Sequence, residues 1–307
     1  ISLYLACETM TATCYSTTAT PFRGEVALSY WQTLTRVAER EGVSPSTISR
    51  VLNNTEKPSI VVSQYVDVMR FGLAVCDDFG LKVGSAVTPG SYPVLGVTLL
   101  SCQTIRQVLE QVVRYESLNH DLGTSQFDIG DIESRYRWVP NPLYLPEQAD
   151  IVSFNLVMSV FAGIQTFSPW LINQCIPIKK ICFMAPEPEN ASIYRTYFDT
   201  DIYFNQPENS VVVNSDVLAW PVLNGDSASF DALTAYADTL LNTKPNQHDI
   251  VWQLKSILPD ALRRQTYKVE DIARHLNMSA RTLQRKLKEA DCSYQQLLDD
   301  VRKQLSE

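Results

Sequence analysis

The most informative stretch of the chain reads VEDIARHLNMSARTLQRKLKEA and covers residues 269–290. Its first part, Val269–Leu276, places apolar residues at 269, 272, 273 and 276, which is the spacing of one face of a short helix. Ser279 stands where a second helix, Ala280–Ala290, needs an N-cap oxygen, and Leu283 and Leu287 give that helix a buried side. Two short helices joined by a tight turn are typical of a helix–turn–helix, whose second helix enters the major groove of DNA with its N-terminus first.

The polar side of the second helix carries residues suited to reading DNA. Arg281, Gln284 and Arg285 lie away from the leucine stripe. Arginine matches the O6 and N7 atoms of guanine and glutamine matches adenine, in both cases through two hydrogen bonds, so we predict that these three residues contact bases. Lys286, Lys288 and the Ser279 hydroxyl suit phosphates. The candidate DNA-binding residues are therefore Ser279, Ala280, Arg281, Gln284, Arg285 and Lys288.

The charge distribution supports a local contact with a polyanion. The whole chain has a net charge of −8, yet residues 261–290 carry eight basic and three acidic residues. A solvated helix face would also explain this segment, so charge alone leaves the two interpretations open. The residue pattern within the segment favours DNA.

Composition restricts the class of protein. A chain of 307 residues with 45% hydrophobic and 20% charged residues is typical of about two globular domains. Its longest apolar run, Ile151–Gly163, is shorter than the ~18–20 residues of a membrane helix, so no membrane contact is expected. Seven scattered cysteines without a C-x-x-C pair favour a reducing cytoplasm over disulfides or a zinc site. The three histidines are isolated and no catalytic motif occurs, so we expect no enzyme, no metal and no cofactor.

Residues 25–242 mix helices and strands without strict alternation, which predicts an α+β body. Six aromatic residues are expected in its core, from which some could line an internal cavity: Phe154, Phe161, Trp170, Phe183, Tyr203 and Phe204. Helices are predicted at about 27–41, 45–52, 61–79, 104–118, 149–167, 192–198 and 227–241, and strands at 94–100, 127–139, 178–184, 201–204 and 211–213.

Residues 278–289, MSARTLQRKLKE, closely resemble the first helix–turn–helix of AraC/XylS-type transcription regulators, and residues 293–298 with Arg302 continue the resemblance. Segments of the body, among them Phe79–Gly84, Tyr194–Phe198 and Ile202–Asn205, are similar to the arabinose-binding-like N-terminal domain of one branch of that family. The resemblance covers about residues 27–307. It implies a transcription regulator whose N-terminal domain senses a small molecule and often dimerises; nothing in the residues carries over the sugar itself.

The resemblance also implies a domain division. We expect a flexible lead at 1–24, an effector-binding and dimerisation domain at 25–242, a linker at 243–260 and an all-α helix–turn–helix subdomain at 261–307. The family has a second helix–turn–helix beyond a linking helix, and residues 301–305 resemble only the start of that helix. We therefore expect this chain to hold about half of the family's DNA-binding domain and to bind DNA weakly, with strong salt dependence.

A second stretch, residues 36–54, resembles a LacI-type helix–turn–helix in which residues 45–52 would read DNA. A body of repeated βα units should then follow, whereas the residues after 80 resemble the AraC-type effector domain. We expect these residues to form a helical hairpin packed on that domain, and groove binding by residues 43–54 stays an alternative.

Together these features predict a cytoplasmic, effector-responsive regulator that binds double-stranded promoter DNA and an unidentified small molecule. A homodimer and contact with RNA polymerase belong to the same prediction. The alternative is a truncated protein that senses a ligand or dimerises without holding DNA by itself. The sequence assigns no effector-contacting residue.

Overall fold

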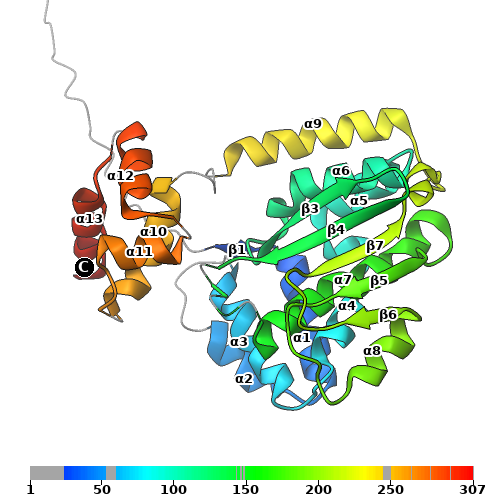
Figure 1. Ribbon diagram of the computed structural model, residues 1–307, viewed down its shortest axis with the longest axis horizontal. Coiled ribbons are helices and arrows are strands. Elements are labelled where there is room, and N and C mark those ends of the chain that lie inside the picture. Colours follow the sequence, from blue (N-terminus) through cyan, green and yellow to red (C-terminus); the bar gives the residue numbers. More distant parts are fainter. Residues whose placement is uncertain are drawn as a thin grey trace, which may run out of the picture.

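The computed structural model describes residues 24–52, 60–142, 144–145, 147, 149–244, 250–263, 265–276, 278–290 and 292–306. The lead expected at residues 1–24 lies outside the described residues except for Gly24. As expected, an α+β domain precedes an all-α region (Figure 1).

A five-stranded sheet forms one layer of the N-terminal domain. Its strand order is β3 (Gly123–Ile129), β4 (Glu133–Pro140), β7 (Ser210–Asn214), β5 (Ile178–Cys182) and β6 (Asp201–Tyr203). Neighbouring strands run antiparallel except β5 and β6, which are parallel and connected through α8 (Ala191–Phe198). A separate short sheet pairs β1 (Glu25–Val26) with β2 (Ile60–Val61).

Helices α6 (Ile105–Tyr115) and α7 (Ile151–Ile172) pack on the inner face of this sheet (Figure 1). Helix α7 is long and apolar enough to cross a membrane by length and composition, but 78% of its most apolar window is buried inside the fold, as in a core helix. It begins where the Asp150 carboxylate accepts a hydrogen bond from the Ser153 amide at 2.7 Å. It ends at Asn173, whose φ of 56° is the left-handed conformation common at helix C-termini.

The strand predicted at residues 94–100 is wrong, because Pro93–Ser101 form helix α5. This segment is buried on most sides, so its sequence has no polar face from which the helical period could be read. Proline at the first helical position and the Thr98 hydroxyl, which donates to the Val94 carbonyl at 2.8 Å, suit a helix.

Two further predictions need correction. The helix expected at 61–79 is divided into α3 (Val62–Leu73) and α4 (Phe79–Gly84), because the chain turns at 74–78 and lays Phe79 against Gly72. Of the six aromatic residues expected in the core, Trp170 and Tyr203 are about half exposed. Trp170 lies near the end of α7, and Tyr203 points outward from the edge strand β6.

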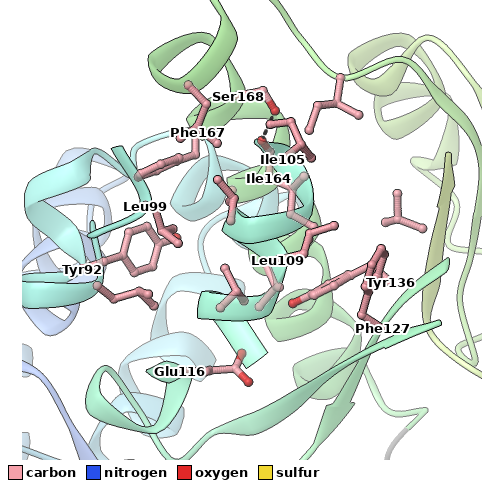
Figure 2. A pocket seen from close by; sticks show the side chains of 18 of the residues that line it. Tyr92, Leu99, Ile105, Leu109, Glu116, Phe127, Tyr136, Ile164, Phe167 and Ser168 are labelled. Atoms are coloured by element: carbon pink, nitrogen blue, oxygen red, sulfur yellow. Dashed lines mark hydrogen bonds between the residues drawn. The ribbon is translucent and has the colours of Figure 1, made fainter. Parts of the chain in front are cut away.

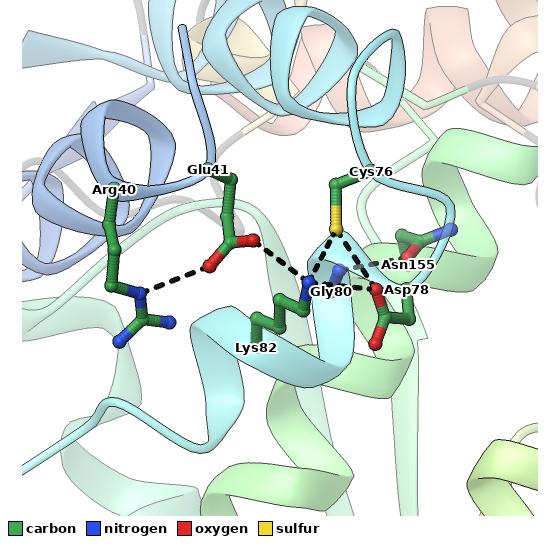
Figure 3. Close-up of polar contacts among 7 residues, drawn as sticks. All are labelled: Arg40, Glu41, Cys76, Asp78, Gly80, Lys82 and Asn155. Atoms are coloured by element: carbon green, nitrogen blue, oxygen red, sulfur yellow. Dashed lines mark hydrogen bonds and ion pairs between the residues drawn. The ribbon is translucent and has the colours of Figure 1, made fainter.

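The helix pair α1 (Leu28–Arg40) and α2 (Pro45–Leu52) packs on α3, as expected for a hairpin. A polar cluster ties the end of α1 to α4 (Figure 3): the Lys82 ammonium contacts Glu41 Oε2 at 2.8 Å and Cys76 Sγ at 3.1 Å. The Asn155 side chain of α7 accepts the Gly80 amide at 2.9 Å. These bonds join α1, α4 and α7 into one unit.

The remaining elements complete the two regions. The N-terminal domain also contains the 3-10 helices η1 (Pro89–Ser91), η2 (Glu116–Leu118) and η3 (Ser215–Ala219), and helix α9 (Ser227–Thr243). The C-terminal region contains α10 (Ile250–Arg263), α11 (Val269–His275), α12 (Ala280–Glu289) and α13 (Tyr294–Ser306), which share a core of their own. Residues 250–260, within the range expected as a linker, form most of α10, since Ile250, Leu254 and Leu258 recur at helical spacing and enter that core.

Close contact between α4 and α7 generates a first prediction. A Cβ atom at Gly80 would lie 2.1 Å from the Asn155 carbonyl oxygen, so Gly80→Ala must push the two helices apart. We expect a loss of about 1–3 kcal/mol in the free energy of unfolding, measured by urea denaturation. Gly90→Ala is the matched control, because the nearest atom to a Cβ there is 3.7 Å away. Equal stability of both variants would contradict the packing described.

Candidate functional site

The turn between α11 and α12 has the geometry predicted for a helix–turn–helix. The Ser279 hydroxyl caps α12 by accepting the Thr282 amide at 3.1 Å. The Met278 amide donates to the Ala273 carbonyl at 2.9 Å, which closes the turn. Leu283 and Leu287 are buried. The sequence prediction for this segment is therefore confirmed in its helices, its cap and its buried side.

The opposite face of α12 is open to solvent. Arg281, Gln284, Arg285 and Lys288 are exposed, and Ala280 is half-buried at the first helical position. Arg285 reaches Glu289 at 2.5 Å, but both side chains are mostly exposed, so this ion pair is weak enough to exchange for a phosphate or a base. The face is free to enter a groove; which residues touch DNA stays a prediction.

A cavity of about 140 Å³ lies between the inner face of the sheet and helices α5, α6 and α7 (Figure 2). Its wall is mainly aliphatic and aromatic. Leucine, isoleucine and valine from α5, α6, α7 and η3 form one part, and the rings of Tyr30, Tyr92, Phe127, Tyr136 and Phe167 form another. An apolar cavity of roughly this size can hold a molecule as large as benzene.

One acidic residue, Glu116, lines the cavity at the start of η2. Its carboxylate accepts three hydrogen bonds from the sheet: from the Ser125 amide at 2.6 Å, the Ser125 hydroxyl at 2.8 Å and the Trp138 indole at 2.9 Å. Burial raises the pKa of Glu116 to about 7, although these hydrogen bonds act in the opposite direction. Glu116 therefore carries a partial charge near neutral pH.

Two neighbouring polar side chains in the wall each have one atom without a hydrogen-bond partner. Within the described part of the chain, Asn119 Oδ1 and His120 Nδ1 are buried and have no hydrogen-bond partner. Burial lowers the pKa of His120 to about 4, so its imidazole is neutral at physiological pH. Buried polar atoms are costly when unpaired, so a ligand in the cavity that bonds to these two atoms would gain stability from them.

Sequence reasoning missed this cavity. None of the six aromatic residues singled out from the sequence lines it. One signal was available: Glu116 follows Val112 by four residues, so an acid continues the apolar face that begins at Ile105. Among the described residues, no group of three or more histidine, cysteine or acidic side chains could hold a metal ion.

An α+β domain with an internal cavity, followed by a helix–turn–helix, suits a regulator that joins small-molecule binding to DNA binding. Residues 37–222, more than half of the chain, match the family described as the arabinose-binding domain of AraC transcription regulators, N-terminal, and the chain belongs to this family. Residues 255–289 match a second family, described as bacterial regulatory protein, Fis family. The protein is thus an effector-responsive, DNA-binding transcription regulator, and its family is not one of enzymes.

Relatives agree with this class. The chain is 25% identical over 243 residues to an ornithine utilization regulator of Pseudomonas aeruginosa, across 76% of this chain and 68% of that protein. The crystal structure of the transcriptional regulator CdpR from Pseudomonas aeruginosa shares its fold, with a TM-score of 0.52 and 15% identity over 89% of this chain and 83% of that one.

The family matches refine two sequence interpretations. The AraC-type assignment holds for the N-terminal domain, whereas the match over the helix–turn–helix is to the Fis family, so the AraC/XylS assignment of residues 278–289 stays a prediction. The LacI-like residues from 37 onward lie within the effector-domain match, and α2 buries Ile48 in that domain's core. Groove binding by this helix pair remains untested.

The buried carboxylate generates a second prediction. Because the pKa of Glu116 is raised from 4.5 to about 7 in the folded chain, its contribution to stability is complete below pH 4.5 and is lost as the pH rises through 7. Compared with a Glu116→Gln variant, the wild type should lose roughly 2–4 kcal/mol of unfolding free energy between pH 4.5 and 8.

Urea unfolding at pH 5 and pH 8 measures this difference. His120 has the opposite trend, since its lowered pKa costs stability as the pH falls from 6.5 through 4, but it is present in both proteins and cancels in the comparison. Glu110→Gln, at an exposed position of the preceding helix α6, is the control. An identical pH dependence for wild type and Glu116→Gln would contradict the burial of a titrating carboxyl.

Proposed function

We propose that the cavity beside Glu116 is the effector site and that α12 reads promoter DNA. The observation that carries the proposal is the pair of unpartnered buried atoms, Asn119 Oδ1 and His120 Nδ1, in the wall of an apolar cavity within the effector-domain match. Arg281, Gln284 and Arg285 would contact bases, while Lys286, Lys288 and the Ser279 hydroxyl would contact phosphates, and Ala280 would lie against the DNA at the start of the helix. An AraC/XylS-type assignment of residues 278–289 belongs to this proposal.

A chain of contacts leads from the cavity towards the C-terminal region. The segment that holds Glu116, Asn119 and His120 is bonded to α9 at two points. The Tyr115 hydroxyl donates to Asp238 Oδ1 at 2.6 Å, and Arg114 forms an ion pair with Asp238 at 2.8 Å.

At the end of α9, the Lys244 ammonium contacts Asp121 Oδ1 at 3.1 Å and donates to the Ser117 carbonyl. The Asp121 side chain is fully buried. A ligand that moves residues 116–120 would therefore move the last element of the N-terminal domain before α10, and so bias how the helix–turn–helix is presented to DNA.

The remaining proposals follow from the class of protein. A cytoplasmic location, a homodimer and contact with RNA polymerase are consistent with a regulator that binds promoter DNA. For the domain boundaries we propose an effector domain at 25–242 and a helix–turn–helix subdomain at 261–307, with the part of the expected linker that forms α10 packed on that subdomain. We propose neither ornithine, which the relative's name contains, nor arabinose, named in the family description, as the effector of this chain. An amino-acid carboxylate or several hydroxyls would find few hydrogen-bond partners in an apolar wall.

The DNA-binding proposal yields a third prediction. Arg285→Ala should cost about 1–3 kcal/mol on a duplex that the wild-type chain enriches from a random pool, and much less on a scrambled duplex. Fluorescence anisotropy at one fixed salt concentration measures both affinities. Arg70→Ala is the matched control, because Arg70 is an exposed helical arginine that also pairs with a nearby carboxylate, here Asp67 at 3.0 Å, but lies in the N-terminal domain. Equal losses on both duplexes would remove Arg285 from the base-reading residues.

The effector cavity yields a fourth prediction. Toluene, a neutral molecule of fitting size, should raise the melting temperature of the wild type, since binding to the folded state alone stabilises it. Leu109→Phe fills the cavity from α6 and should abolish the shift (Figure 2). Val113→Phe, at an exposed position of the same helix, should retain it. An unchanged toluene shift in Leu109→Phe would place binding elsewhere.

A further inference from the structure

The electrostatic character of the cavity restricts its ligand. Glu116 is the only acidic residue in the wall, and neither lysine nor arginine is among the described residues that line it. A carboxylate or phosphate ligand would therefore face an acid without a compensating cation. Anionic effectors are disfavoured on this ground, and polyhydroxylated ones by the apolar wall.

Three atoms in this part of the wall can accept a further hydrogen bond. The three donors that reach its carboxylate come from Ser125 and Trp138, and only the Ser125 amide is directed at Oε2. An ionised carboxylate can accept about four hydrogen bonds, so Oε2 has room for another donor. Asn119 Oδ1 is an unpartnered acceptor, and His120 Nδ1 is one in the neutral tautomer protonated on Nε2. A ligand group that has up to three donors and no acceptor would match these atoms. A protonated amino group is such a group.

Tyrosine rings surround the same end of the cavity. The rings of Tyr30 and Tyr92 lie 5.6 Å apart between centroids, and Tyr30 lies 5.0 Å from the His120 ring. The Tyr136 hydroxyl is bonded to the Ser125 hydroxyl at 2.7 Å, which places this third ring beside Glu116. Aromatic faces attract organic cations, most strongly where water is excluded.

We propose that the effector is a small organic amine, a protonated amino group on a single ring or a short aliphatic body, with Glu116 as its counter-ion and Asn119 and His120 as further acceptors. The apolar body fills the space among α5, α6 and α7, which matches about one six-membered ring in size. This inference rests on the proposed function, because it assumes that the cavity is the effector site.

Calorimetric titrations of the full chain at pH 8 with benzylamine, benzyl alcohol, toluene and benzoate test the ligand class. We expect benzylamine to bind at least tenfold more tightly than toluene or benzyl alcohol, and benzoate not to bind. Toluene binding without preference for benzylamine would overturn the amine assignment and leave the cavity as a ligand site. Absence of binding by all four compounds would overturn both proposals.

Dependence on pH and on the acceptors gives an independent readout. Benzylamine affinity should rise at least severalfold from pH 6 to pH 8 as Glu116 ionises, because burial raises its pKa to about 7. Among the other groups near Glu116, burial lowers the pKa of His120 to about 4 and raises the pKa values of Tyr30, Tyr92 and Tyr136, so the ionisation of these four groups lies outside this pH range. The Lys244 ammonium forms an ion pair with Asp121.

Two variants complete the experiment. Glu116→Gln should lose both the pH dependence and the discrimination between benzylamine and toluene. Should this variant fail to fold, Asn119→Leu removes one acceptor without touching the bonds to the sheet and should weaken benzylamine several-fold more than toluene. Preserved discrimination in a folded Glu116→Gln variant, or equal effects on both ligands in Asn119→Leu, would contradict the amine site.

Discussion

The N-terminal domain depends on one buried carboxylate. Glu116 lies at the junction of α6 and η2 and is hydrogen-bonded to the sheet. Its hydrogen bonds to Ser125 and Trp138 hold η2 against β3 and β4. A charge in this position is costly unless it is paired, and its pKa near 7 shows that the three bonds offset the cost only in part. The contact between η2 and the sheet therefore rests on a group that an additional hydrogen-bond donor would stabilise.

Two halves of the molecule differ in how far the sequence alone predicts them. The helix–turn–helix could be predicted in detail because its determinants are local: the Ser279 cap, the Leu283 and Leu287 stripe and the polar residues between them all lie within one short segment. Most helices and strands of the body followed from periodicity as well. Helix α5 did not, since a helix that is buried on most sides and a buried strand share the same apolar composition.

The cavity could not be predicted because no local pattern encodes it. Its wall is assembled from α1, α5, α6, α7 and the inner face of the sheet, segments that are up to 188 residues apart in the sequence, from Tyr30 to Leu218. Six aromatic residues chosen by type alone miss it, because aromatic character does not say which side of a helix meets the sheet. Only Glu116, an acid that follows the apolar face of α6, indicated from the sequence that this position has a role besides packing.

The N-terminal domain and the C-terminal helices have separate hydrophobic cores, so one chain can carry a ligand cavity and a helix–turn–helix that do not share a core. The core of α10–α13 is complete in itself, with Leu254, Leu283 and Leu298 buried together. The helix–turn–helix therefore does not need the N-terminal domain for its own geometry. What the N-terminal domain can change is the position in which the helix–turn–helix is held. Helix α9 is the last helix before α10, and it is bonded to the cavity segment through Asp238 and Lys244. Under the proposed function, a ligand would regulate DNA binding by changing where a rigid α12 is held, because the core of α10–α13 keeps this helix in one shape.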